Sequence, residues 1–454
     1  MIRGIGLCLF LVIVSFGLAY FRINQQLQSP EFVEALQTYC HQKWNIDAEF
    51  EPFTWTFGFI HSPSMKGKGL PGSSIISIEA NRLSVHLKWG DFFQGNWHLK
   101  KLSIRQADIV FQEPLSLSKK KMPQPATTVD ASIVDNIVIQ QLRLAWFPKS
   151  EEPGVLENLR LHIAPTDEGW SIQGKNGVLK QRHFEIAVPR LEARYIGSSL
   201  LVDDAELRGP SGGAMIVRGA IDCSAARKVH LNAAIEGFSI EPLLPRRLRP
   251  FISGVLYGQI SLDGTLESSK ALLGSGQLQL ADGMISGIAS LQKYEKWLPQ
   301  WACKKINFRD VSCKLRLYKG QLNLSQITFE IEKLARIEGN LATRGNRIEA
   351  YLQLGVTPVC IQKIPGAAAR VFNTSAKGFY WTPWHISGTW SAPSEDLSAR
   401  LRSAAGQTLQ QDALDILSSW LDVIKGAIPF SFSSGARVLG GSEFTNQNFF
   451  LNKR

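Results

Sequence analysis

The chain has 454 residues, of which 44% are hydrophobic and 20% charged, and this balance excludes an intrinsically disordered protein. Its six cysteines have no regular spacing, which excludes a disulfide-stapled scaffold and gives no CxxC metal pattern. The formal net charge of +11 is dispersed along the chain. General solubility explains this net charge, and contact with anionic lipid headgroups or acidic polymers is the alternative. We expect no nucleic-acid partner.

The N-terminus is a long apolar segment. From Gly4 to Phe21 the only clearly polar residue is Ser15, and about 18 helical residues just span a ~30 Å hydrocarbon core. We therefore expect a transmembrane anchor at residues 1–22, with the rest of the chain exported. A cleaved signal peptide, with a site near Gly17-Leu18-Ala19, is the alternative. The anchor residues expected in the membrane are Ile5, Leu9, Val12 and Phe16.

A short helix follows and then strands dominate. Ser29-Pro30-Glu31 combines a cap, a proline at the first helical position and an acid, which predicts a helix to about Gln42. Beyond it, apolar and polar residues alternate with the period of two that gives a strand one apolar face. This alternation occurs at Leu83–Trp89, Leu102–Ile104, Leu159–Ile163, Val229–Ile235, Leu315–Leu317, Leu322–Leu324 and Ile348–Leu354.

Three segments depart from the strand pattern. Lys119–Thr128 is basic and then proline-rich, which indicates an exposed loop. Ile285–Trp301 and Leu409–Ile424 have apolar residues at helical spacing. The polar side of the second carries mainly acids, which suits packing on the sheet better than an anionic membrane. Just after Ile285–Trp301, a disulfide between Cys303 and Cys313 is the alternative to free, buried thiols.

So many one-sided strands need a cover for their apolar faces, and the expected helices are too few to provide it. Either two sheets pack together as a sandwich, or the apolar face lines a groove filled by another molecule, for which a lipid chain is suitable. Lys319-Gly320 predicts a hairpin turn whose flanking leucines share one face. These candidate groove residues are Leu315, Leu317, Leu322 and Leu324.

No motif predicts an enzyme, and we expect no cofactor and no metal. Gly67–Gly72 matches GxGxxG and Gly209–Gly213 matches GxSxG, but a strand rather than the required helix is expected after each. Both are therefore interpreted as turns. The eight histidines are scattered without metal-ligand spacing. Accordingly Ser211, Cys303, Cys313 and His385 are expected not to be catalytic.

Two stretches resemble a known family. The first comprises Ile78–Val85, Trp97–Ile104 and Ala107–Phe111, which follow the anchor and short helix. The second runs from Ser253-Gly254 through Gly276–Ile285, Tyr318–Leu322 and Ile337–Leu341 to Ile386–Pro393. The order of strands and glycines resembles the AsmA family, exported proteins anchored in the bacterial inner membrane and related to TamB and YhdP. Together the matches cover about two-thirds of the chain, and they contain no catalytic residues.

The resemblance implies a mainly β fold: an N-terminal transmembrane helix and then an extended, curved antiparallel β-sheet, groove-like, with a few short helices. It also implies a single-pass inner-membrane protein with its bulk in the periplasm. There it would bind phospholipid acyl chains for lipid transport or outer-membrane assembly. A structural envelope scaffold of closed β-sandwich domains is the alternative. The expected regions are 1–22 anchor, 23–118 N-terminal β region, 119–128 loop, 129–250 middle β region, 251–402 C-terminal β region and 403–454 helix and tail.

Overall fold

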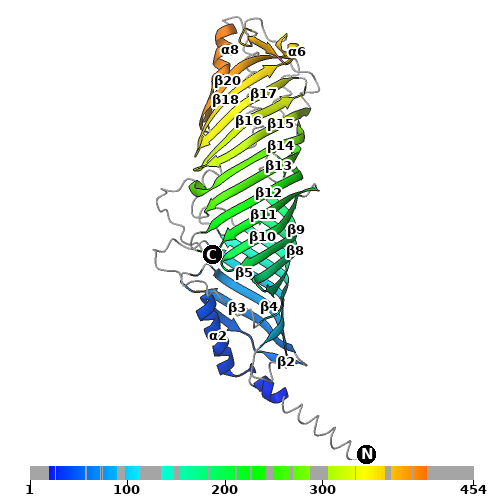
Figure 1. Ribbon diagram of the computed structural model, residues 1–454, viewed down its shortest axis with the longest axis vertical. Coiled ribbons are helices and arrows are strands. Elements are labelled where there is room, and N and C mark those ends of the chain that lie inside the picture. Colours follow the sequence, from blue (N-terminus) through cyan, green and yellow to red (C-terminus); the bar gives the residue numbers. More distant parts are fainter. Residues whose placement is uncertain are drawn as a thin grey trace, which may run out of the picture. The chain divides into compact units, whose positions relative to one another are not determined.

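The computed structural model confirms a mainly β protein (Figure 1). By internal packing the chain divides into two compact units, residues 1–226 and 227–454, and the division lies inside the expected middle region. The structure describes residues 20–25, 27–56, 59–71, 73, 75–88, 98–112, 134–147, 154–181, 184–209, 212–224, 227–241, 249–250, 252–265, 269–286, 305–332, 334–362, 370–389 and 392–405.

Unit 1 contains the helix that its sequence predicts. Helix α2 spans Pro30–Trp44, and the hydroxyl of Ser29 accepts a hydrogen bond from the backbone N–H of Phe32. The strands follow as β1 (Ile46–Phe50), β2 (Thr54–Thr56), β3 (Phe59–Gly69), β4 (Ile75–Leu87), β5 (Leu99–Gln112), β6 (Ile137–Phe147), β7 (Gly154–Thr166), β8 (Gly169–Gln181), β9 (Phe184–Ile196), β10 (Ser199–Gly209) and β11 (Gly212–Asp222).

From β3 to β11 each strand of unit 1 pairs with the next along the chain, while β1 and β2 both pair with β3. One pairing corrects the expected antiparallel sheet: β5 and β6 run parallel. Parallel neighbours need a connection of about a dozen residues or more, and residues 113–136 provide it. The expected loop Lys119–Thr128 falls within this connection and lies outside the described residues.

Unit 2 is built in the same way. Its strands pair in chain order from β12 to β18, and β18 then pairs with β20, which also carries the short β19 and β21. The elements are β12 (Lys228–Ser239), β13 (Ile252–Thr265), η2 (Ser269–Ala271), β14 (Leu273–Ser286), β15 (Lys305–Tyr318), β16 (Gln321–Ile331), β17 (Ala335–Arg344), β18 (Arg347–Val356), α6 (Pro358–Ile361), β19 (Thr374–Ala376), β20 (Phe379–Thr389), β21 (Ala392–Glu395) and α8 (Leu397–Ala405).

Helices differ from expectation in two places. Ile285 was expected to begin a helix but lies near the end of strand β14, opposite Ile252 and Ile306, because pairing with strands on both sides satisfies its backbone hydrogen-bonding groups. The remainder of that segment, the helix expected at Leu409–Ile424 and the transmembrane helix lie outside the described residues. Within the part of the chain that is described, no helix is long and apolar enough to cross a membrane. Helix α8 was not expected.

The free edge of β20 is closed by side chains. Pro383 has no N–H to offer a further strand, and Arg400 donates to its carbonyl oxygen. A carboxylate oxygen of Asp396 accepts from the backbone N–H of His385 at 2.8 Å. These contacts occupy groups that would otherwise pair with another chain.

Candidate apolar binding face

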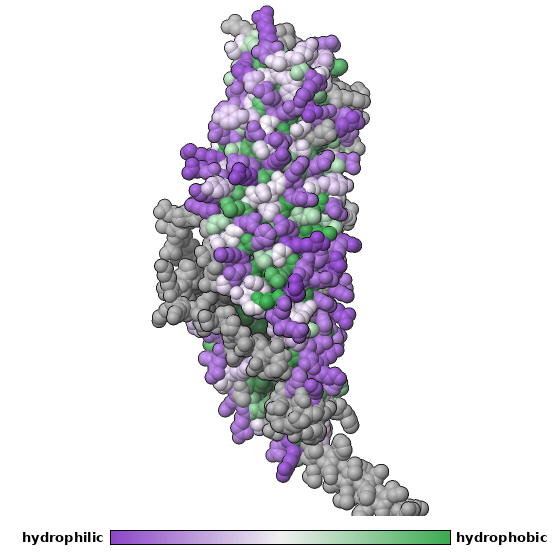
Figure 2. Space-filling model, viewed as in Figure 1, coloured by the Kyte–Doolittle hydropathy of each residue, from purple (hydrophilic) through white to green (hydrophobic). Residues whose placement is uncertain are grey.

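The sheet of unit 2 has one apolar and one polar face. In β18 exposure alternates residue by residue, with Ala350 and Leu352 buried and Glu349 and Tyr351 exposed. Directly opposite residues of neighbouring strands share a face, so the ladder carries this separation from strand to strand. On the other side lie polar residues and exposed tyrosines, and hydrophilic side chains cover much of the surface visible over these strands in Figure 2.

At one end of unit 2 the apolar face is fully covered. Leu397 and Leu401 of α8 are 0% exposed and join a buried cluster with Trp384 of β20 and Leu352 of β18. Thr382 beneath them is also 0% exposed and accepts a hydrogen bond from the guanidinium of Arg400. We call this region, β17–β20 with α8, the capped end.

Farther along the same face the apolar side chains are only half-buried. We call this group the open strip; its members lie outside the buried cluster of the capped end. Register places them together: Leu231 is opposite Leu262, Leu262 opposite Gly274, and Gly274 opposite Leu317. The open strip consists of Leu231, Ile260, Leu262, Leu278 and Leu317.

Glycines alternate with the large residues of the open strip. Gly258 lies opposite Leu278, and Gly276 lies between Ile260 and Leu315. At Gly258, with φ +150°, a Cβ atom would approach the carbonyl oxygen of Gln277 to 2.2 Å, and at Gly276 it would approach that of Gln259 to 2.6 Å. The strands are thus too close on this face for side chains at these positions.

The hairpin expected to carry the candidate groove residues is present. Lys319 and Gly320 have φ of +50° and +72°, as a tight hairpin turn requires. Leu315 is opposite Leu324 and Leu317 opposite Leu322, so all four share the apolar face. Their surroundings differ, however. Leu324 is 7% exposed within the buried cluster, whereas the other three are half-buried.

Unit 1 also has an apolar face, and part of it is covered by helix. Leu27 packs with Phe53, Trp55 and Leu87, while Cys40 of α2 packs over the strand residues around Ile46. Farther along the sheet, the buried residues pack mainly with one another across the strands. They are Ala107, Ile139, Leu142, Leu159 and Leu161.

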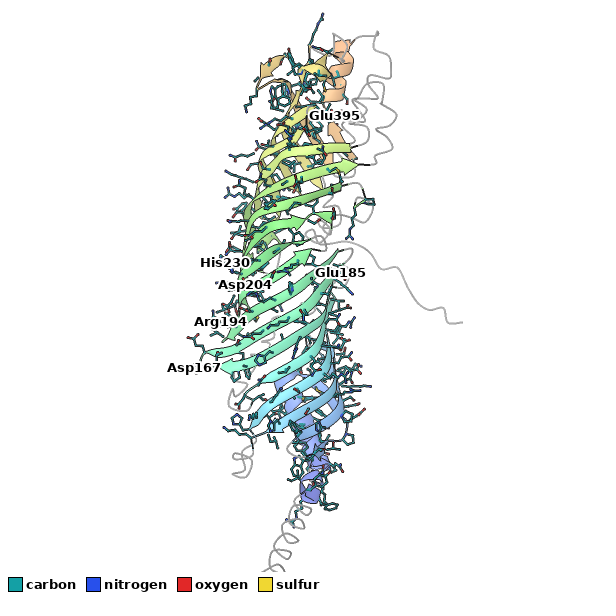
Figure 3. The ribbon with its side chains drawn as sticks, turned by 90° about the vertical axis from the view of Figure 1, so that its right-hand side faces the viewer. Asp167, Glu185, Arg194, Asp204, His230 and Glu395 are labelled. Atoms are coloured by element: carbon teal, nitrogen blue, oxygen red, sulfur yellow. The ribbon has the colours of Figure 1, made fainter. Side chains whose placement is uncertain are left out.

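The charges that look dispersed in the sequence form ion pairs on the polar face of unit 1. Arg143 contacts Asp108 at 2.8 Å and Lys180 contacts Glu157 at 2.8 Å. A bulge in β10 turns both Asp203 and Asp204 toward arginines. Arg194 holds the pKa of Asp203 below its ordinary value by donating hydrogen bonds to it. Figure 3 shows Arg194 and Asp204 along the same side of the ribbon.

Asp204 is the most enclosed of these carboxylates. Its side chain is 9% exposed and contacts the guanidinium groups of both Arg190 and Arg218. Two cations around one buried anion satisfy its charge, so the cluster is structural in character.

Sequence reasoning missed two histidine–carboxylate pairs. His98 contacts Asp135 at 2.7 Å, and His230 contacts Asp263, its ladder partner across β12 and β13. The members of each pair are far apart in sequence, so only the register brings them together. Among the described residues no three His, Cys, Asp or Glu side chains are grouped as metal ligands.

The residues singled out by motif are placed as follows. The first motif is a turn only in its second half: Gly67 and Gly69 end strand β3, and the backbone N–H of Ser73 then donates to the carbonyl oxygen of Leu70 at 2.9 Å before β4 begins. Gly209 and Gly212 join β10 to β11, so a strand follows as predicted. Ser211 and Cys303 lie outside the described residues.

Cys313 is a free cysteine on β15, and burial raises the pKa of its thiol. His385 stacks on the exposed ring of Tyr351, with their centroids 4.6 Å apart.

The described part of the protein thus belongs to the class of one-sided, mainly β proteins with a partly uncovered apolar face. The sequence matches no protein-family model and no characterised protein.

Proposed function

We propose that this protein is a non-enzymatic, AsmA-like component of the bacterial envelope that binds phospholipid acyl chains on its apolar β face. A single-pass anchor would hold it in the inner membrane, and it would serve lipid transport or outer-membrane assembly. The observation that supports it best is the open strip, in which five large apolar side chains are only partly buried on a continuous apolar face.

Exposure of this kind is unfavourable in water unless something covers it. Complete burial of one leucine or isoleucine is worth about 1.5–3 kcal/mol, so five that are up to about a third exposed leave roughly 1–5 kcal/mol available to a ligand. An acyl chain suits the site because it is apolar along its length and makes no directional demands. The glycines between the large residues would leave shallow depressions in which methylene groups can lie.

The alternative is a structural scaffold of closed β-sandwich domains that binds no lipid. The described strands of each unit belong to a single sheet, which favours the open face over two packed sheets. The capped end, however, is closed in the manner that a scaffold would need. A test must therefore distinguish a closed core from an open face within one unit.

The hairpin β15–β16 offers such a test through two leucines of one face. Leu324→Asp should unfold or strongly destabilise unit 2, because it buries an unpaired carboxylate. Leu317→Asp should change the melting temperature little, because water can hydrate the charge, but should lower the amount of bound lipid. The measurement is thermal unfolding together with lipid extraction and mass spectrometry of the purified protein.

Asn323→Asp, on the polar face of the same hairpin, is the matched control for the added charge and should leave both quantities unchanged. A large loss of stability in Leu317→Asp would contradict an open face at this hairpin. Absence of lipid from the wild-type protein, together with unfolding of Leu317→Asp, would favour the scaffold.

A further inference from the structure

Exposed aromatic side chains gather where the described chain begins. Tyr20 and Phe21 are 49% and 67% exposed, and Phe59 at the start of β3 is 42% exposed. Large apolar side chains in water are unfavourable, so such a group indicates a contact surface. Residues 20–25, α2 and β2 all lie at the same end of unit 1 in Figure 1.

Specific contacts fix this group to the sheet. The side-chain oxygen of Asn24 accepts a hydrogen bond from the backbone N–H of Trp55 at 2.7 Å, which ties residues 20–25 to strand β2. The ring of Tyr20 packs on that of Trp55 with centroids 5.4 Å apart. These contacts therefore hold residues 20–25 against strand β2.

Basic side chains lie beside Phe59. Phe59 is opposite His86, and His86 is opposite Lys101 in the next strand. The ring of Phe59 stacks on that of His86 at 4.7 Å, and Lys88 follows just beyond the strand. Arg22, in the helical segment of residues 20–25, is exposed. Aromatic rings next to basic side chains suit the layer of lipid headgroups, where rings lie among apolar and polar groups and cations meet phosphates.

We propose that this collar, defined as Tyr20, Phe21 and Phe59 with the adjoining basic residues, rests in the headgroup layer of a phospholipid bilayer. The occupant follows from the sequence: the apolar segment Gly4–Phe21 ends inside the collar, so a bilayer that holds this segment has its surface at the collar. The proposal rests on the anchor that belongs to the proposed function. It adds that the first strands themselves touch the membrane, which would place the start of the apolar face at the lipid source.

The test uses the full chain in nanodiscs of phosphatidylcholine and phosphatidylglycerol. Phe59→Cys carries a fluorophore in a Cys223→Ser background, because Cys223 is exposed, and mass spectrometry confirms the labelled peptide. A nitroxide on the lipid headgroup should quench this fluorophore about threefold more than one at Ile76→Cys. Ile76 is 39% exposed and lies at the other end of β4, about 33 Å from His86 at ~3.3 Å per residue.

Phe21→Cys gives the same readout if the Phe59 variant does not fold. Equal, weak quenching at both positions would overturn the collar, and so would failure of the full chain to enter nanodiscs. Lipid extraction from the detergent-purified protein, washed free of bilayer lipid before any nanodisc is assembled, separates the two proposals. Acyl chains bound without quenching leave the proposed function standing and remove the collar, whereas quenching without bound acyl chains does the opposite.

Discussion

The capped end and the open strip of unit 2 are made from the same kind of sequence but have different surroundings. Leu352 in β18 and Leu278 in β14 both lie on the apolar face and both alternate with polar neighbours. Leu352 is 6% exposed, since Trp384 and α8 cover it, while Leu278 is half-buried. The alternation defines the face, and the cover decides whether that face is a core or a surface available for binding.

The largest expected effect tests the core at the capped end. Trp384→Ala should lower the free energy of unfolding by about 3–5 kcal/mol, because it removes a large side chain that is 1% exposed. Leu278→Ala, the control in the open strip, should cost about 1 kcal/mol, because its side chain is already partly in water. Chemical denaturation measures both. Equal losses would contradict the distinction between the two regions.

A second comparison concerns the glycines of the open strip. Gly258→Ala should destabilise by about 2–4 kcal/mol, because the new Cβ meets the carbonyl oxygen of Gln277. Gly345, in the β17–β18 turn with φ +59°, has nothing within 4 Å of a new Cβ, so Gly345→Ala should cost only about 1 kcal/mol. If thermal unfolding found both variants alike, close strand approach would not explain the glycine at position 258.

The smallest expected effect concerns the polar face. Because Arg194 lowers the pKa of Asp203, this contact stabilises the folded state above the unfolded pKa of about 4 and is lost as pH falls through the lower, folded value. Both side chains are well exposed, so Asp203→Asn should shift the melting temperature at pH 7 by about 1 °C or less.

Asp167→Asn, at the exposed β7–β8 turn, is the control for the removal of one charge. The small difference between the two variants should disappear at pH 2 and in high salt. A shift of many degrees in Asp203→Asn would mean that the outer face contributes to stability as the apolar face does.

The sequence predicts the strands well but not their cover. The alternation of Ile348, Ala350, Leu352 and Leu354 and the turn at Lys319-Gly320 are local signals, and both are confirmed. Burial of Leu324 but not of Leu317 depends on residues far away in the chain, so no local pattern contains it. The same holds for the parallel direction of β6 and for the pairing of His230 with Asp263. The leucines of α8, at positions 397 and 401, have the i, i+4 spacing of a helix, and this signal could have been found.

Strand order in each unit has a consequence for how the chain acquires its structure. From β6 to β11 and from β12 to β18 each strand pairs with the one made just before it. The sequence separation between contacting residues is therefore small, and little loop entropy is lost before each new pairing. A chain that emerges with its N-terminus first can add one hairpin at a time to a finished edge. Among the described strands, those at the end of unit 2 give this stepwise growth a built-in stop, because Pro383, Asp396 and Arg400 close the last edge there.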